Sequence, residues 1–177
     1  MKRSVWLWQL FGFAATSLGG VLLHFLYEWL GRAVWVAAFS GVNESTWEHM
    51  KLLFWPMLAF ALLQSLFFRD RKDFWCVKLE GILIGITLIP VIFYTYNGAV
   101  GVSPAWLNIA FFFICAAIAF LYEGQRFSEA DGGCCRRAAI LALIALALMF
   151  ILFTFATPRI NLFKDPIAES YGIGTYR

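Results

Sequence analysis

Five long apolar runs constrain this chain more than any other feature of its sequence. Each run is long enough for a helix that crosses a bilayer, which takes about 20 residues. They cover residues 5–30, 47–68, 74–96, 104–122 and 138–156. With 62% hydrophobic residues among 177, a water-soluble domain of this size could not bury its apolar surface. The sequence therefore predicts an all-α, polytopic membrane helical bundle of about five transmembrane helices, built as a single domain over residues 1–177.

The amino terminus resembles a secretory signal peptide, because two basic residues at positions 2 and 3 precede an apolar stretch. That stretch continues to about Leu30, roughly twice the length of a signal-peptide core, so we interpret it as an uncleaved first span. A shorter apolar stretch at residues 33–42 cannot span a bilayer. We expect it to lie in the interface or to dip back into the protein.

Lysine and arginine are distributed unequally between the two predicted sides of the membrane. One side carries Lys2, Arg3, Arg69, Arg71, Lys72, Arg126, Arg136 and Arg137, and the other carries Arg32, Arg159, Lys164 and Arg177. The positive-inside rule then places the amino terminus in the cytoplasm and the tail, residues 157–177, outside the cell membrane. The net charge is only +3 and no broad basic face is present, which excludes nucleic acid as a partner.

The four cysteines do not form a disulfide pattern. Cys76, Cys134 and Cys135 fall in or beside predicted cytoplasmic segments, and Cys115 falls inside a span. Adjacent cysteines without CxxC spacing or a second pair do not form a zinc motif. We expect reduced, structural thiols.

A cluster of histidine and glutamate lies near the outer ends of the first two predicted spans. His24 and Glu28 are four residues apart and share a helical face. His24 lies about 9 Å below Leu30, and His49 lies about one turn into the second span, by the rise of a helix. The two imidazoles are therefore expected at similar depth, with Glu28 and Glu44 slightly above them.

Ionisable groups inside spans cost free energy, so each one requires a partner or a function. Two neutral imidazoles and one carboxylate are a common ligand set for zinc or iron. We predict that His24, Glu28 and His49 bind a divalent transition metal and that Glu44 acts as general base toward a metal-bound water. The hypothesis is a metal-dependent hydrolase, or a related enzyme, that acts on a lipid or apolar substrate.

Other interpretations stay open at this point. The cluster could instead serve an ion- or proton-coupled transporter or channel, which with five short spans would require homo-oligomerisation for a wide pore. It could also belong to a scaffold or binding protein without chemistry, or hold a haem between the two histidines. Ser45 and Glu48 fit a capping box, which explains Glu48 as a cap rather than a ligand.

Several further polar residues bear on where a pocket would lie. We expect Glu80 to pair locally with Lys78, Arg69 or Arg71, the alternative being a carboxylate on an ion path. The outer half is the more polar half, which predicts a pocket that opens outward. Its polar residues are Tyr94, Tyr96, Asn97, Asn108, Thr154 and Thr157.

The stretch Asn43-Glu44-Ser45-x-Trp47-Glu48-His49-x-Lys51 resembles a family of small bacterial multi-pass membrane proteins of unknown function. The resemblance extends over most of the chain and includes Phe163-Lys164-Asp165-Pro166 in the tail. It implies a membrane-embedded fold but no activity, because the family has no assigned catalytic residues.

Overall fold

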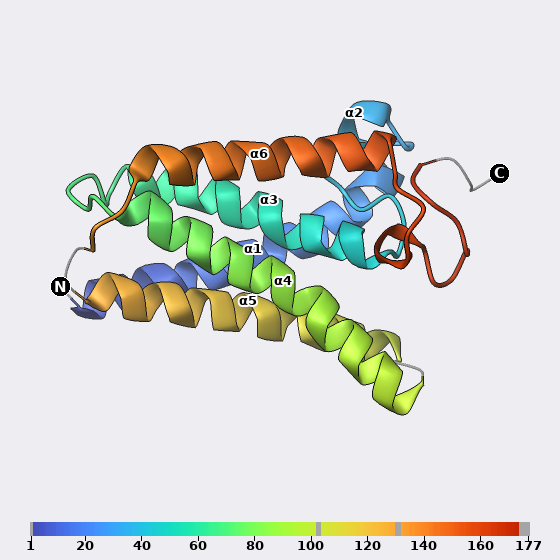
Figure 1. Cartoon of the computed structure of the whole chain (residues 1–177), viewed down its shortest axis with the longest axis horizontal. Coiled ribbons are helices and arrows are strands. Elements are labelled where there is room, and N and C mark those ends of the chain that lie inside the picture. Colours follow the sequence, from blue (N-terminus) through green and yellow to red (C-terminus); the bar gives the residue numbers. More distant parts are fainter. Residues whose placement is uncertain (1, 102–103, 130–131, 174–177) are drawn as a thin grey trace.

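The computed structural model describes residues 2–101, 104–129 and 132–173, and its long elements are all helices (Figure 1). Its elements are α1 (Lys2–Trp29), α2 (Val34–Ala37), α3 (Thr46–Ser65), α4 (Phe74–Val100), α5 (Ala105–Ser128), α6 (Arg136–Phe155) and the short 3-10 helix η1 (Asn161–Phe163). The all-α fold class is confirmed. Arg177, used in the charge count above, lies outside the described residues.

Helix α3 forms the centre of the bundle, and the other long helices pack around it (Figure 1). Its Phe60 ring contacts Trp8 on α1 and Phe120 on α5, each at about 6.1 Å between centroids. Its Phe54 ring contacts Phe150 on α6 at 4.9 Å. The core is therefore an aromatic column along α3, and the start of α1 and the end of α6 lie at opposite ends of the bundle (Figure 1).

Four helices among the described residues are long and apolar enough to cross a membrane: Arg3–Trp29, Phe74–Val100, Trp106–Ser128 and Arg136–Phe155. Helix α3, which the sequence predicted as a span, is not among them. It carries Glu48, Lys51 and Gln64, all buried inside the bundle. Leucines such as Leu18 and Leu141 instead cover the outside of the neighbouring helices. The structure is that of a helical membrane bundle, while the role of α3 as a fifth span and the orientation of the chain stay predictions.

The segment between α1 and α3 folds back onto the bundle. This is one of the two alternatives that the sequence predicted for residues 33–42. Gly31 and Arg32 adopt positive φ values of 65° and 61° and end α1. The following short helix α2 then buries Val36 and Ala37 against Tyr27. The carboxyl-terminal tail also packs back, because the Phe163 ring lies 4.7 Å from that of Trp47. Both segments cover the end of the bundle where α1 ends and α3 begins, which we call the histidine end.

The expectation of four reduced cysteines is wrong, because a disulfide joins Cys76 and Cys134 across 58 positions. The two cysteines meet because the loop after α5 packs against the start of α4. Arg71 donates to the carbonyl oxygen of Glu129, and Gly132 N–H donates to Asp73 Oδ2 at 3.0 Å. These long-range bonds bring Cys134 to α4, and no local spacing in the sequence indicates them.

Alkylation of the denatured protein tests this disulfide. Without reduction we expect two iodoacetamide adducts, on Cys115 and Cys135, which are the two free cysteines. After reduction we expect four, since the chain contains four cysteines. Intact-protein mass spectrometry reads both states, and four adducts before reduction would show that the bond is absent. The same measurement also tests the orientation of the chain. Thiols persist in the cytosol, so an intact bond in the membrane protein would place this end of the bundle on the oxidising side.

Candidate functional site

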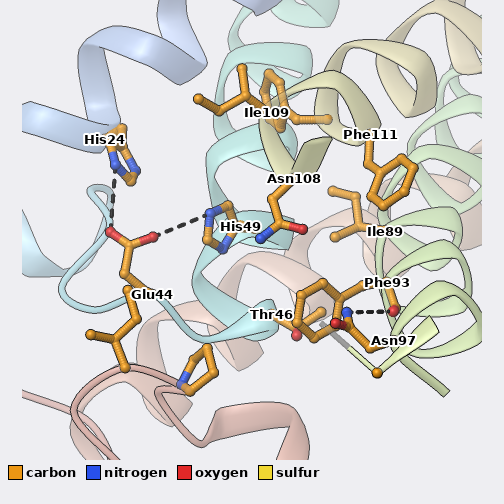
Figure 2. A pocket seen from close by; sticks show the side chains of 14 residues that line it. His24, Glu44, Thr46, His49, Ile89, Phe93, Asn97, Asn108, Ile109 and Phe111 are labelled. Carbon is orange, nitrogen blue, oxygen red and sulfur yellow. Dashed lines mark hydrogen bonds and ion pairs between the residues drawn. The ribbon is translucent and has the colours of Figure 1, made fainter. Parts of the chain in front are cut away.

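Glu44 lies between the two histidines at the histidine end (Figure 2). Its Oε1 is 3.6 Å from His24 Nε2, and its Oε2 is 3.6 Å from His49 Nε2. The two imidazole rings are 6.0 Å apart between centroids. The sequence-based expectation that these two rings lie close together is confirmed. The distances to Glu44 are those of ion pairs rather than of hydrogen bonds, which span about 2.7–3.2 Å.

The loop that carries Glu44 is fastened to the bundle at several backbone atoms. Ser40 Oγ donates to Leu23 O and accepts from Tyr27 N–H, which ties the loop to the last turns of α1. The backbone N–H of Glu44 itself donates to Asp165 Oδ2 in the tail at 3.1 Å. Asp165 is fully buried. Glu44 is therefore positioned by the last turns of α1, which bind its loop through Ser40, and by the tail.

A buried ion pair in the first turns of α3 also holds the loop that carries Glu44. Glu48 Oε2 lies 2.5 Å from Lys51 Nζ and accepts from Val42 N–H at 3.1 Å. Lys51 Nζ also donates to Ala37 O in α2 and to Thr154 Oγ1 in α6. The capping box forms only in part, because Ser45 Oγ accepts from Glu48 N–H while the Glu48 carboxylate turns to Lys51. Glu48 is thus neither a metal ligand nor a reciprocal cap.

The hydrogen bonding of His49 fixes which ring nitrogen is basic. His49 Nδ1 lies 2.9 Å from Ser45 O, and a carbonyl oxygen only accepts, so Nδ1 carries the hydrogen. In the neutral ring Nε2 is then the unprotonated nitrogen, and it faces Glu44 Oε2. Two acceptors face each other there. A proton on His49, or a donor group of a bound molecule, makes this contact favourable.

A cavity of about 770 Å³ adjoins the three side chains. Its described walls are mostly apolar, with Phe93, Phe111 and Phe112 among them, and Glu44 carries the one permanent charge of the described lining. In Figure 2 the Asn108 side chain, which also lines this cavity, is drawn next to the His49 ring. Asn108 Oδ1 is buried and has no hydrogen-bond partner among the described residues. The cavity thus combines a few polar side chains with a mostly aromatic and aliphatic lining.

Glu28 does not join the histidines, although the sequence predicted it as a metal ligand. Its Oε1 pairs instead with Arg32 Nη2 at 3.0 Å, one turn along the chain, and its side chain is exposed. Among the described residues no group of three His, Cys, Asp or Glu could hold a metal ion. The predicted zinc or iron site of His24, Glu28 and His49 therefore finds no support in this arrangement.

Other polar residues singled out from the sequence divide between the pocket and the packing. Asn97 and Asn108 line the cavity, as a pocket at this end requires. Thr154 instead supports Lys51. Glu80 accepts from Tyr122 Oη at 2.6 Å and from Arg126 Nε at 3.3 Å, so its expected local partners are wrong. Sequence reasoning missed Ser40 and Asp165 as positioning residues, although Asp165 lies inside a stretch that carries the family resemblance.

Comparison with known proteins gives a family and no activity. A family model described as a family of unknown function (DUF6512) matches residues 2–173. No curated protein matches the chain, and no solved structure does. The match covers the histidine end, the loop with Glu44 and the tail with Asp165.

Proposed function

This chain belongs to that family of unknown function, and we propose that it is an intramembrane enzyme that acts on an amphipathic, lipid-like substrate with His49 as general base. The observation that carries the proposal is a carboxylate placed between two imidazoles on the wall of an otherwise apolar cavity. Ionisable groups at this depth are costly and gather where a membrane protein performs its function.

The cavity suits a molecule with an apolar chain and a small polar head. The rings of Phe93, Phe111 and Phe112 offer apolar surface of the kind that buries acyl chains. Because no Lys or Arg is found in the described lining, a phosphate head group has no cationic partner there. A head group that donates a hydrogen bond, such as a hydroxyl, or that carries a carbonyl, fits Glu44, His49 and Asn108 better.

A hydrolytic step can be written from these side chains. His49 Nε2 removes a proton from water, and the oxygen attacks the carbonyl carbon of an ester or amide in the bound head group. Ser45 O holds the Nδ1–H of His49, and the negative charge of Glu44, 3.6 Å from Nε2, stabilises the resulting imidazolium. The proton then passes from His49 to the leaving group as the carbon–heteroatom bond breaks. Asn108 lies beside His49 and offers an amide to the carbonyl oxygen.

Turnover of a fluorogenic long-chain acyl ester by the purified protein in liposomes tests the proposal. General base catalysis contributes about 10²–10⁴-fold, so we expect His49→Gln to reduce the rate by at least about 100-fold and Glu44→Gln to reduce it strongly. Glu28→Gln is the matched control, because Glu28 pairs with Arg32 away from the cavity. We expect it to retain the wild-type rate.

Two results would count against this proposal. If Glu28→Gln and His49→Gln reduced the rate of ester turnover equally, Glu28 would be part of the site, which would support the three-ligand metal hypothesis. Metal analysis of the purified protein would then test that hypothesis. If native mass spectrometry showed the ester bound to the protein but no turnover were measured, the chain would be a binding protein and not an enzyme. The transport and scaffold hypotheses stay untested.

A further inference from the structure

A second group of polar side chains lies deep in the bundle, toward the end where α1 begins. Four helices contribute one side chain each, and every one of these side chains is at most 2% exposed: Gln9 on α1, Gln64 on α3, Lys78 on α4 and Glu123 on α5. We call these four residues the polar layer. It lies about 22 Å along α1 from His24, by helical rise, so the site described above does not include it.

The packing of Gly12 shows that three of these four residues lie at the same height along the bundle. A Cβ atom at Gly12 would come within 2.5 Å of the rings of both Phe60 and Phe120, so α1 touches α3 and α5 there. Gln9, Gln64 and Glu123 lie three or four residues from this contact on their own helices, each on the same face and in the same direction.

Two further contacts place the remaining members. The Trp8 ring lies between Phe60 and Phe67, at 6.1 and 4.7 Å, which sets the start of α1 beside Gln64. Lys78 Nζ donates to Glu123 Oε2 at 2.5 Å, which brings α4 to the same level. The Phe60 and Phe120 rings lie within 5.5 Å of the Lys78 ammonium. The layer is therefore a polar section through four helices, closed by aromatic rings.

Most hydrogen-bonding capacity of this layer is unused by the protein. Both amide atoms of Gln9, both amide atoms of Gln64, and Glu123 Oε1 are buried with no partner among the described residues. Buried polar atoms in native proteins are nearly always hydrogen-bonded, to protein or to ordered water. Orphaned groups gathered at one level of a bundle therefore indicate a bound molecule between them.

We propose that Gln9, Gln64 and Glu123 form an internal binding site whose ligand is water, held beside the Lys78–Glu123 pair. The orphaned atoms include donors, the two Nε2 groups, and acceptors, the three Oε1 atoms, and water serves both. The layer already balances one ammonium with one carboxylate, so no ion is required for neutrality. Buried water typically makes about three hydrogen bonds to such groups, which this set of atoms can supply.

Radiolytic hydroxyl labelling of the full-length protein in detergent tests this site, because radicals formed from bound water oxidise the side chains next to it. We expect Phe60 and Phe120 to be labelled at least about tenfold faster than Phe54, an equally buried ring outside the layer. The double variant Gln9→Leu/Gln64→Leu should lose this labelling and unfold at a lower temperature. Gln125→Leu, an exposed glutamine on the same helix as Glu123, is the matched control and should change neither.

A dry layer predicts the opposite set of results. Phe60 and Phe120 would then be labelled no faster than Phe54, and the double leucine variant would unfold at a higher temperature, because orphaned amides would be replaced by apolar groups. Either result overturns the proposal. The outcome is independent of the histidine site, whose ester hydrolysis is measured separately and does not involve these residues.

Discussion

Replacing Lys51 by methionine should destabilise the folded chain by about 3–5 kcal/mol, the range found when one partner of a buried ion pair is removed. Lys51 and Glu48 are both almost inaccessible to solvent and lie 2.5 Å apart. In Lys51→Met the Glu48 carboxylate stays buried without its counter-charge. The variant also loses the hydrogen bonds from Lys51 Nζ to Ala37 O and Thr154 Oγ1. Denaturant unfolding in detergent micelles, followed by tryptophan fluorescence, measures the change.

The double variant Lys51→Met/Glu48→Gln separates charge burial from packing. It should recover part of the lost stability, because glutamine keeps an acceptor for Val42 N–H and leaves no unpaired charge. Lys164→Met is the control, since Lys164 pairs with Glu169 at the surface and exposed pairs contribute little. Should Lys51→Met unfold like the wild type, Lys51 would not be a buried link between α2, α3 and α6. We also expect Lys51→Met to impair the histidine site, because the pair holds the loop that carries Glu44.

Removing one member of the Lys78–Glu123 pair should be as damaging, with a loss of about 3–5 kcal/mol for Lys78→Met or Glu123→Leu. Both side chains are buried, and four phenylalanine rings lie within 6 Å of the Lys78 ammonium. Each single variant leaves one buried charge without its counter-charge in the polar layer. The same denaturant titration reports the free energy of unfolding.

The double variant Lys78→Met/Glu123→Leu provides the decisive comparison. Replacing a whole buried pair by apolar groups is often neutral or stabilising, so the double variant should be more stable than either single one. Arg126→Met is the matched surface control, because the Arg126–Glu80 pair is partly exposed on neighbouring turns of the same helices. Additive losses in the double variant would show that Lys78 and Glu123 do not act as a pair.

Local pattern was sufficient to predict the helices and the meeting of the two histidines. Apolar runs longer than about 20 residues favour membrane helices whatever surrounds them. His24 and His49 meet because each lies at a fixed rise from a helix end, and both ends lie at the same end of the bundle. The Ser45 cap was also local, since a cap bonds within its own first turn.

Contacts between distant segments could not be obtained in the same way. The sequence placed Glu28 beside His24 correctly along the helix, but Arg32 is one turn further and takes its carboxylate. Glu44 lies beside His24 in place of Glu28, because Asp165 in the tail binds the backbone of the loop that carries Glu44, more than 120 positions earlier in the chain. The disulfide between Cys76 and Cys134 depends likewise on how the loop after α5 returns to α4.

What the sequence determined by itself is the set of long helices and the position of each polar residue along its own helix, because both follow from composition and from 1.5 Å of rise per residue. The tertiary structure decided which of those residues face one another. The partners of Glu44, Lys78, Glu80 and Cys76 lie on other segments, and rotation and neighbour choice among packed helices depend on the whole set of side chains between them. The histidine site and the polar layer are both products of that packing.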